Sequence, residues 1–114
     1  MGAPDQLTLV KGTLDLLVLR ALSWDAMHGF EITCWIEERS GGRLDVDDSA
    51  LYQALHRLEE RGLAEADWGV TENNRRARYY RVTQAGKAHL RAETATWLRY
   101  AETITGILAP SRAS

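Results

Sequence analysis

The sequence predicts a mainly helical chain with one small β-hairpin, arranged as a winged helix-turn-helix with a long C-terminal dimerisation helix. Three observations predict this fold: three helical patterns precede residue 63, a basic hairpin pattern follows them, and a heptad-like apolar repeat comes last. At 114 residues with 45% hydrophobic content, the chain is long enough for one domain and an extension. The expected parts are a flexible arm over 1–8, a winged domain over 9–83, a dimerisation helix over 84–108 and a disordered tail over 109–114.

Two helices are expected in the first forty residues. Residues 9–22 place apolar side chains on nearly every side, which predicts a helix buried over most of its surface. Residues 24–29 then form a connector, and residues 30–39 predict a second helix. The Ser-Gly-Gly run at 40–42 ends this helix, because consecutive glycines are poor helix formers.

The aromatic residues and the cysteine of this part are assigned to the core. Trp24 and Trp35 are expected to be buried, and Phe30 is expected to face inward from the second helix. Cys34 lies among apolar neighbours, so we expect a small buried side chain rather than a redox sensor. Since the chain has one cysteine, no intramolecular disulfide can form, which is typical of a reducing cytoplasm.

The middle of the chain predicts a third helix with two different faces. Leu51, Leu55 and Leu58 recur at i, i+4 and i+7 and form one buried stripe. Asp48 or Ser49 is the expected N-cap. The other face presents phenol, amide, imidazole and guanidinium groups, which suits a DNA major groove. The residues expected to contact DNA from this helix are Ser49, Tyr52, Gln53, His56 and Arg57.

Alternatives remain open for this helix. Taken alone, the segment is better explained by an ordinary amphipathic helix with a solvated face. Tyr52 is expected on a phosphate rather than on a base, because it lies near the start of the helix. Gln53 carries an amide that can pair bidentately with adenine. His56 either enters the groove or packs against the hairpin, and the sequence favours neither position.

The basic hairpin changes the balance in favour of DNA. Residues 63–68 and 76–82 predict two strands, although the pattern does not fix which face of the second strand is buried. The net charge is −2, but no acidic residue lies between Glu72 and Glu93, where six basic residues lie. Because local charge decides whether a polyanion binds, we assign the hairpin to phosphate or minor-groove contacts, and the alternative is a solvated basic hairpin. The residues expected to make these contacts are Arg75, Arg76 and Arg78.

A long helix is expected after the hairpin. Thr83 is its expected cap, residues 84–108 form it, and Pro110 ends the ordered region. Its apolar residues recur with heptad spacing over two to three heptads, which is short for a free coiled coil but enough to dock on a partner helix. Trp97 serves either a dimer interface or a ligand site. The expected dimer or effector surface comprises Leu90, Trp97, Tyr100, Ala101, Ile104 and Leu108.

Several function classes lack their sequence signals. No apolar run has membrane-spanning length, and the N-terminus has no basic start followed by an apolar stretch, so we expect a cytoplasmic protein. The three histidines lack metal-ligand spacing, and there is no Gly-rich phosphate loop or nucleophile elbow. We therefore expect no enzyme activity, no catalytic residue, no metal and no cofactor. The alternatives to DNA binding are a winged-helix protein-interaction module that dimerises through its last helix and, less favoured, a small-molecule carrier.

The chain resembles the PadR family of bacterial transcriptional regulators in four blocks. Lys11–Leu19 is similar to the family's opening helix, and Met27–Ile32 is similar to its His-Gly-Tyr turn into the second helix. Leu51–Glu59 resembles its recognition helix, and Asn73–Gly86 resembles its wing and the entry to its last helix. The four blocks occur in the family's order, and the resemblance covers residues 9–108.

This resemblance implies a homodimeric repressor of the short form, in which the first and last helices make the dimer interface. Its partner would be double-stranded DNA with a pseudo-palindromic operator. Some short members bind flat aromatic or drug-like molecules with a tryptophan of the last helix, which is Trp97 here, so a small aromatic effector is a further expectation. Ala50 and Gln53 depart from residues that the family often has, so the operator is expected to differ from those of better-known relatives. Phe30 replaces the family's usual tyrosine, so any hydrogen bond made by that hydroxyl is expected to be absent.

Overall fold

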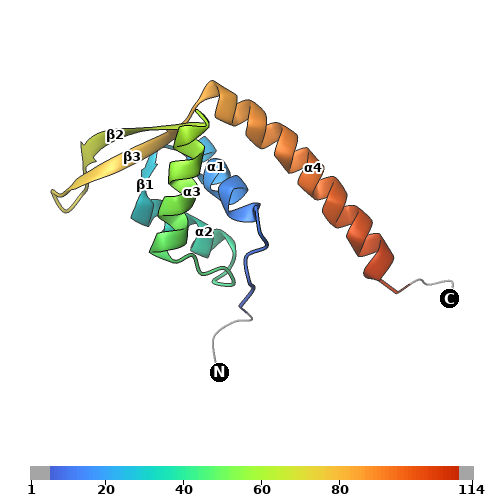
Figure 1. Cartoon of the computed structure of the whole chain (residues 1–114). Coiled ribbons are helices and arrows are strands. Elements are labelled where there is room, and N and C mark those ends of the chain that lie inside the picture. Colours follow the sequence, from blue (N-terminus) through green and yellow to red (C-terminus); the bar gives the residue numbers. More distant parts are fainter. Residues whose placement is uncertain (1–5, 111–114) are drawn as a thin grey trace.

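The structure is a computed structural model that describes residues 6–110 of the chain. The order of elements is α1 (Thr13–Trp24), β1 (Met27–His28), α2 (Gly29–Arg39), α3 (Asp48–Glu60), β2 (Ala64–Val70), β3 (Arg76–Val82) and α4 (Gln84–Leu108). Helices α1 to α3 lie together beside a small sheet, and α4 leaves them at an angle (Figure 1). The predicted fold class is thus confirmed. Residues 1–5 of the predicted arm and 111–114 of the predicted tail lie outside the described residues.

The strands form one antiparallel sheet in the order β1-β3-β2. Strands β2 and β3 make the wing, with Ala64 opposite Val82 at its base. Strand β1 adds two residues to the other edge of β3, where Met27 lies opposite Tyr80. The predicted connector over 24–29 therefore contains a strand, which the sequence does not indicate because two residues are too few to show an alternating pattern.

The first helix starts later than the sequence pattern predicts. It begins at Thr13 rather than at residue 9, because Gly12 precedes it with a φ of 91°, a left-handed conformation outside the helix. The preceding segment instead runs beside the loop between α2 and α3, where the Leu7 N–H donates to the Arg43 carbonyl at 2.9 Å. Apolar residues of this segment fit the helical pattern, so the sequence predicts a longer helix, but these residues lie outside α1.

Side-chain caps fix where α3 and α4 begin. The N-cap of α3 is Asp47, whose carboxylate accepts a hydrogen bond from the Ala50 N–H at 2.8 Å, so the expected cap one or two positions later is wrong. The cap of α4 is Thr83, as predicted, and its hydroxyl accepts from the Gly86 N–H at 3.0 Å. The same hydroxyl donates to the Gly62 carbonyl at 2.7 Å, which ties the start of α4 to the end of α3.

The hydrophobic core lies between α1, α2, α3 and one face of the sheet. Tyr80 is 4% exposed, so the face of β3 that carries it packs inward. The sequence pattern does not determine which face of this strand is buried. Burial raises the pKa of its phenol. The predicted leucine stripe of α3 is buried as expected, and this packing turns the polar face of α3 outward. The largest fully buried side chains are Val18, Leu19, Ile32, Leu51, Leu55 and Leu58.

Three core assignments made from the sequence are wrong. Trp24 and Phe30 are 70% and 73% exposed, and Cys34 is exposed as well. Phe30 and Cys34 lie one turn apart on α2, on the side opposite Ile32 and Ile36, which occupy the buried positions. The helix has apolar residues on both sides, so its composition alone does not show which side faces the core.

Arg39 explains how two tryptophans are accommodated near the surface. Its guanidinium carbon lies 5.2 Å from the ring centroid of Trp24 and 4.6 Å from that of Trp35. Trp35 is partly buried against the core, which agrees in part with its predicted position. Trp24 is the last residue of α1 and has a cation rather than the core as its neighbour.

Within residues 6–110, no helix has the length and apolar composition that a membrane crossing requires. Helices α1, α2 and α3 have 12, 11 and 13 residues, and the 25-residue α4 carries charged side chains along its length. The same part of the chain holds no group of three His, Cys, Asp or Glu residues that could bind a metal ion.

Candidate nucleic-acid interface

Helix α3 presents one polar face to solvent, opposite its buried leucines. The five side chains that the sequence assigns to DNA on this helix come together there and line one shallow surface. They offer a hydroxyl, a phenol, an amide, an imidazole and a guanidinium, the groups that contact base edges and phosphates in a major groove. These residues are Ser49, Tyr52, Gln53, His56 and Arg57.

Both edges of this face are held by an arginine–carboxylate pair. On the α1 side, Arg57 Nε and Nη2 donate to the two carboxylate oxygens of Asp15 at 3.1 and 2.6 Å. On the wing side, Arg78 Nη2 donates to Glu59 at 2.8 Å. The hydrogen bond to Asp15 raises the pKa of the Arg57 guanidinium. The two pairs fix α3 between α1 and the wing, and no sequence signal indicates the first, because Asp15 and Arg57 lie 42 residues apart.

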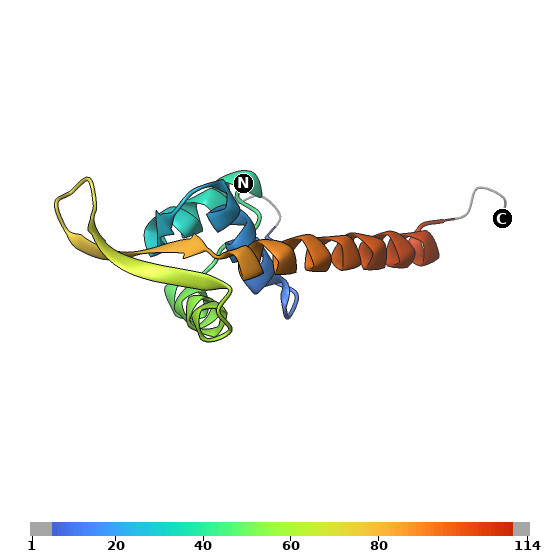
Figure 2. The same ribbon diagram turned by 90° about the horizontal axis from the view of Figure 1, so that it is seen from above.

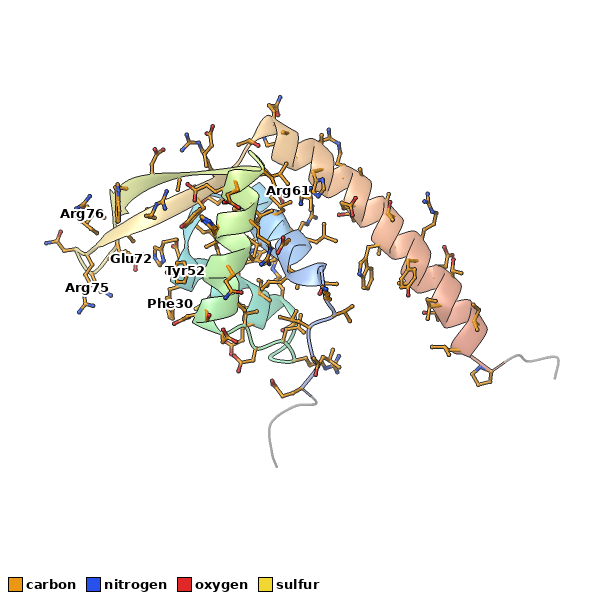
Figure 3. The ribbon with its side chains drawn as sticks, viewed as in Figure 1. Phe30, Tyr52, Arg61, Glu72, Arg75 and Arg76 are labelled. Atoms are coloured by element: carbon orange, nitrogen blue, oxygen red, sulfur yellow. The ribbon has the colours of Figure 1, made fainter. Side chains whose placement is uncertain are left out.

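The wing ends in a tight turn between β2 and β3. Strand β2 runs to Val70, two residues beyond its predicted end. The Thr71 N–H then donates to the Arg75 carbonyl at 2.8 Å, and the Asn74 N–H donates to the Thr71 carbonyl at 2.9 Å. Asn74 has a φ of 62°, a left-handed conformation that asparagine tolerates better than most residues. This turn places Arg75 and Arg76 at the far end of the wing (Figure 3).

Acidic residues neutralise the arginines nearer the base of the wing. Arg81 donates to Asp67 and, at 2.9 Å, to Glu65, both on the neighbouring strand β2. The hydrogen bond to Asp67 is the main reason that the pKa of the Arg81 guanidinium is raised. Arg78 is likewise paired with its α3 carboxylate. The positive charge of the segment without acids is therefore balanced by carboxylates across the sheet, because antiparallel pairing places the acids of β2 beside the arginines of β3.

The arginines at the wing tip, unlike those near its base, are not neutralised by carboxylates of the described residues. Within residues 6–110, neither Arg75 nor Arg76 makes an ion pair. The guanidinium carbon of Arg76 lies 4.4 Å from the ring centroid of Trp68, which supports the cation at the surface. Glu72 is an acid in the same turn (Figure 3). The tip is thus the part of the wing whose positive charge is available to a phosphate backbone.

A groove of about 680 Å³ lies between the wing and helices α2 and α3. Tyr52 lines it and packs on the first residue of α2, since a Cβ at Gly29 would lie only 2.7 Å from the Tyr52 hydroxyl oxygen. Phe30 lines the same groove, and Figure 3 shows Tyr52 and Phe30 on the side of the molecule that carries Arg75 and Arg76. Sequence reasoning missed Gly29 and Phe30 here, because only the packing of α2 on α3 brings them beside Tyr52.

Helix α4 passes α1 and then continues beyond the rest of the domain (Figure 2). The side chains predicted for a dimer or effector surface divide into two groups. Leu90 is buried in the domain core, and the others are at least partly exposed, with Trp97 at 42% and Leu108 at 76%. Trp97, Tyr100 and Leu108 are exposed, and Ala101 and Ile104 are partly buried.

A second groove, of about 480 Å³, lies between α1 and the part of α4 from His89 to Tyr100. Trp97 and Tyr100 line it from α4, and Asp15 and Leu16 line it from α1. Asp15 therefore touches this groove and, through Arg57, the polar face of α3.

Known proteins resemble this chain over most of its length. The transcriptional regulator PadR-like family matches residues 18–92, from α1 into the first turns of α4. An uncharacterized protein of Lysinibacillus sphaericus is 30% identical over 96 residues, which are 84% of this chain and 88% of that protein. A transcriptional regulator from Clostridium thermocellum superposes with a TM-score of 0.78 at 26% identity, over 86% of this chain and 95% of that one. A PadR family transcriptional regulator from Eggerthella lenta gives 0.75 at 26% identity, over 89% and 86%.

Proposed function

The chain belongs to the PadR-like family of transcriptional regulators, and on this premise we propose that it is a repressor that binds a pseudo-palindromic operator as a homodimer. Membership makes it a DNA-binding winged helix-turn-helix protein and a regulator rather than an enzyme. A repressor acts by covering DNA that the transcription machinery needs, so it requires tight and selective binding rather than chemistry. The interface must then supply both affinity and sequence preference.

One observation supports this mode of binding most directly: Tyr52 of α3 and the unpaired arginines of the wing tip line the same groove. A recognition helix in the major groove with a wing on the neighbouring backbone or minor groove requires this arrangement. Arg75 and Arg76 then neutralise phosphates, which gives affinity that falls as salt rises. The polar face of α3 supplies the contacts that distinguish one sequence from another.

The side chains of α3 take different parts in this binding mode. Gln53 lies in the middle of the exposed face, where its amide can pair with the N6 and N7 atoms of adenine. Tyr52 lies at the wing edge and donates its hydroxyl to a phosphate. Ser49 and His56 flank Gln53 and complete the surface. Arg78 contributes less than the tip arginines, because Glu59 already takes one of its donors.

Dimerisation is assigned to α4 together with α1. The projecting part of α4 exposes more apolar surface than a monomer needs, and a second copy of the chain would cover it. Two recognition helices related by a two-fold axis would then enter successive major grooves, with half-site centres about 34 Å apart. The exposed large apolar side chains of α4 are Trp97, Leu98, Tyr100, Ile107 and Leu108.

A small aromatic effector is a second part of the proposal. The groove between α1 and α4 is lined by Trp97 and Tyr100, whose rings can stack on a flat molecule. Such a ligand would release the repressor only if it binds one dimer geometry more tightly than the other, because equal affinity for both shifts nothing.

The test is binding of the purified chain to duplex DNA from the region upstream of its own coding sequence, against a shuffled duplex of equal length and composition. We expect tight, salt-dependent binding that prefers the upstream duplex, with two chains per site. Arg75→Ala with Arg76→Ala should weaken binding to both duplexes, and Arg81→Ala with Asp67→Asn is the control because it removes a paired cation together with one of its carboxylate partners. Equal, weak binding to both duplexes would contradict an operator there and favour the protein-interaction alternative.

A further inference from the structure

A bidentate ion pair connects the polar face of α3 with the first turn of α1. Arg57 Nε and Nη2 donate to Asp15 Oδ2 and Oδ1 at 3.1 and 2.6 Å. The Arg57 side chain is 50% exposed and that of Asp15 is 23% exposed, so the carboxylate lies on the protected side of the pair. We propose that Asp15 is a positioning residue for DNA recognition, which orients the Arg57 guanidinium toward the major groove. This inference rests on the proposed function, because it requires α3 to read an operator.

The geometry of the pair leaves the DNA-binding edge of the guanidinium free. Arginine has five N–H donors, and Asp15 takes the Nε–H and one N–H of Nη2. Within residues 6–110, no acceptor takes an N–H of Nη1. The edge formed by Nη1 and Nη2 is suited to two parallel hydrogen bonds, with the O6 and N7 atoms of guanine or with two phosphate oxygens. Asp15 thus holds one edge of Arg57 and leaves the other edge for the ligand.

The position of Arg57 on α3 agrees with this role. It follows Gln53 by one helical turn, and both side chains line the same shallow surface. A free arginine samples many rotamers and loses that freedom when it binds DNA, whereas an arginine already held by a carboxylate loses less. Asp15 belongs to α1, which packs against α3 in the core, so the restraint on Arg57 comes from a rigid neighbour.

The charge of Asp15 distinguishes a positioning role from general attraction to DNA. The Arg57–Asp15 pair is close to neutral, so it adds little to the counterion release that drives non-specific binding. Its contribution should therefore appear in the preference for the operator over other duplexes. A merely structural ion pair would instead change protein stability and affect all duplexes alike.

The experiment measures affinities for the operator and for a shuffled duplex by fluorescence anisotropy at one salt concentration. For Asp15→Asn, we expect the ratio of the two affinities to fall about tenfold, while affinity for the shuffled duplex stays the same or rises. In an Arg57→Ala background, Asp15→Asn should change the ratio less than about twofold, since the side chain that it positions is absent. Glu37→Gln removes an exposed acid of α2 and is the matched control for net charge, with an unchanged ratio expected.

Two results would overturn this inference while the proposed function stands: a wild-type ratio for Asp15→Asn, or a loss that is equally large in the Arg57→Ala background. If the wild-type chain prefers no operator at all, the proposed function fails and the inference fails with it. Arg57→Lys keeps the charge but lacks the planar edge, so it should lower the ratio as Arg57→Ala does. A wild-type ratio for Arg57→Lys would also overturn the role, whether or not Asp15→Asn folds.

Discussion

The wing and α4 extend from opposite ends of the same domain, and they expose opposite chemistry (Figure 2). The wing ends in Arg75 and Arg76, which have no ion-pair partner within residues 6–110. Helix α4 instead exposes large apolar side chains such as Trp97 and Leu108 along its projecting part. A cationic tip suits a polyanion, and an apolar helix suits another apolar surface. The comparison implies that DNA contact and the proposed dimerisation reside in separate parts of the chain and can be disrupted separately.

The largest effect is expected from Trp97→Asp. This change places a charge in the apolar surface of α4, so the proposed dimer should dissociate at micromolar concentration in sedimentation velocity. Operator affinity should then fall about a hundredfold, because the two half-sites are no longer bound by one particle. Ala95→Asp introduces the same charge at an exposed position outside the predicted dimer or effector surface and is the matched control. A full dimer for Trp97→Asp would show that this residue lies outside the interface.

The corresponding change in the wing is Arg75→Ala combined with Arg76→Ala. Affinity for every duplex should fall about tenfold at moderate salt, and the slope of log affinity against log salt should decrease by roughly 2, since each lost phosphate contact removes about 0.9. The oligomeric state should not change. A salt titration of anisotropy on wild type and variant measures both quantities. An unaltered slope would mean that the tip does not touch phosphate.

Sequence reasoning succeeds where a local signal determines the structure. Helix α4 begins at Gln84 and ends at Leu108, as predicted, because Thr83 caps its first turn and an apolar repeat continues along it. The second wing strand, Arg76–Val82, is also confirmed, because β-favouring residues follow a turn-forming pair. The same holds for the leucine stripe of α3, whose spacing alone identifies a buried face.

Features that depend on contacts between distant segments could not be predicted in this way. The exposure of Trp24 and Phe30 follows from which side of each helix meets the core, and both sides carry apolar residues. The charge of the wing is the clearest case, because Arg81 is neutralised by Asp67 through strand pairing rather than by a sequence neighbour. A count of arginines along the chain therefore overestimates the free charge of the wing.

A more selective effect is expected from Gln53→Ala. The Gln53 side chain lies on the exposed face of α3, between the wing and the Arg57–Asp15 ion pair. Neither the wing nor α4 occupies this face. Its loss should lower the ratio of operator to shuffled affinity about fivefold, because one bidentate base contact is removed, while the salt slope and the dimer stay unchanged. Competition binding with the two duplexes measures the ratio. Equal losses on both duplexes would show that Gln53 reads no base.

The smallest effect is expected from Glu72→Gln at the wing tip. Glu72 lies in the same turn as Arg75, and its negative charge would face the phosphates that the tip approaches (Figure 3). Removing this charge should raise affinity for all duplexes about twofold at low salt, and the gain should vanish at high salt, where screening shortens the range of the repulsion. Arg81→Ala combined with Asp67→Asn is the control and should leave affinity unchanged, because it removes a cation together with one of its carboxylate partners and so keeps the net charge of the wing. If this control instead weakened binding as much as the double tip variant, the paired arginine would contribute to DNA binding as strongly as the unpaired ones, and the distinction between the base and the tip of the wing would be lost.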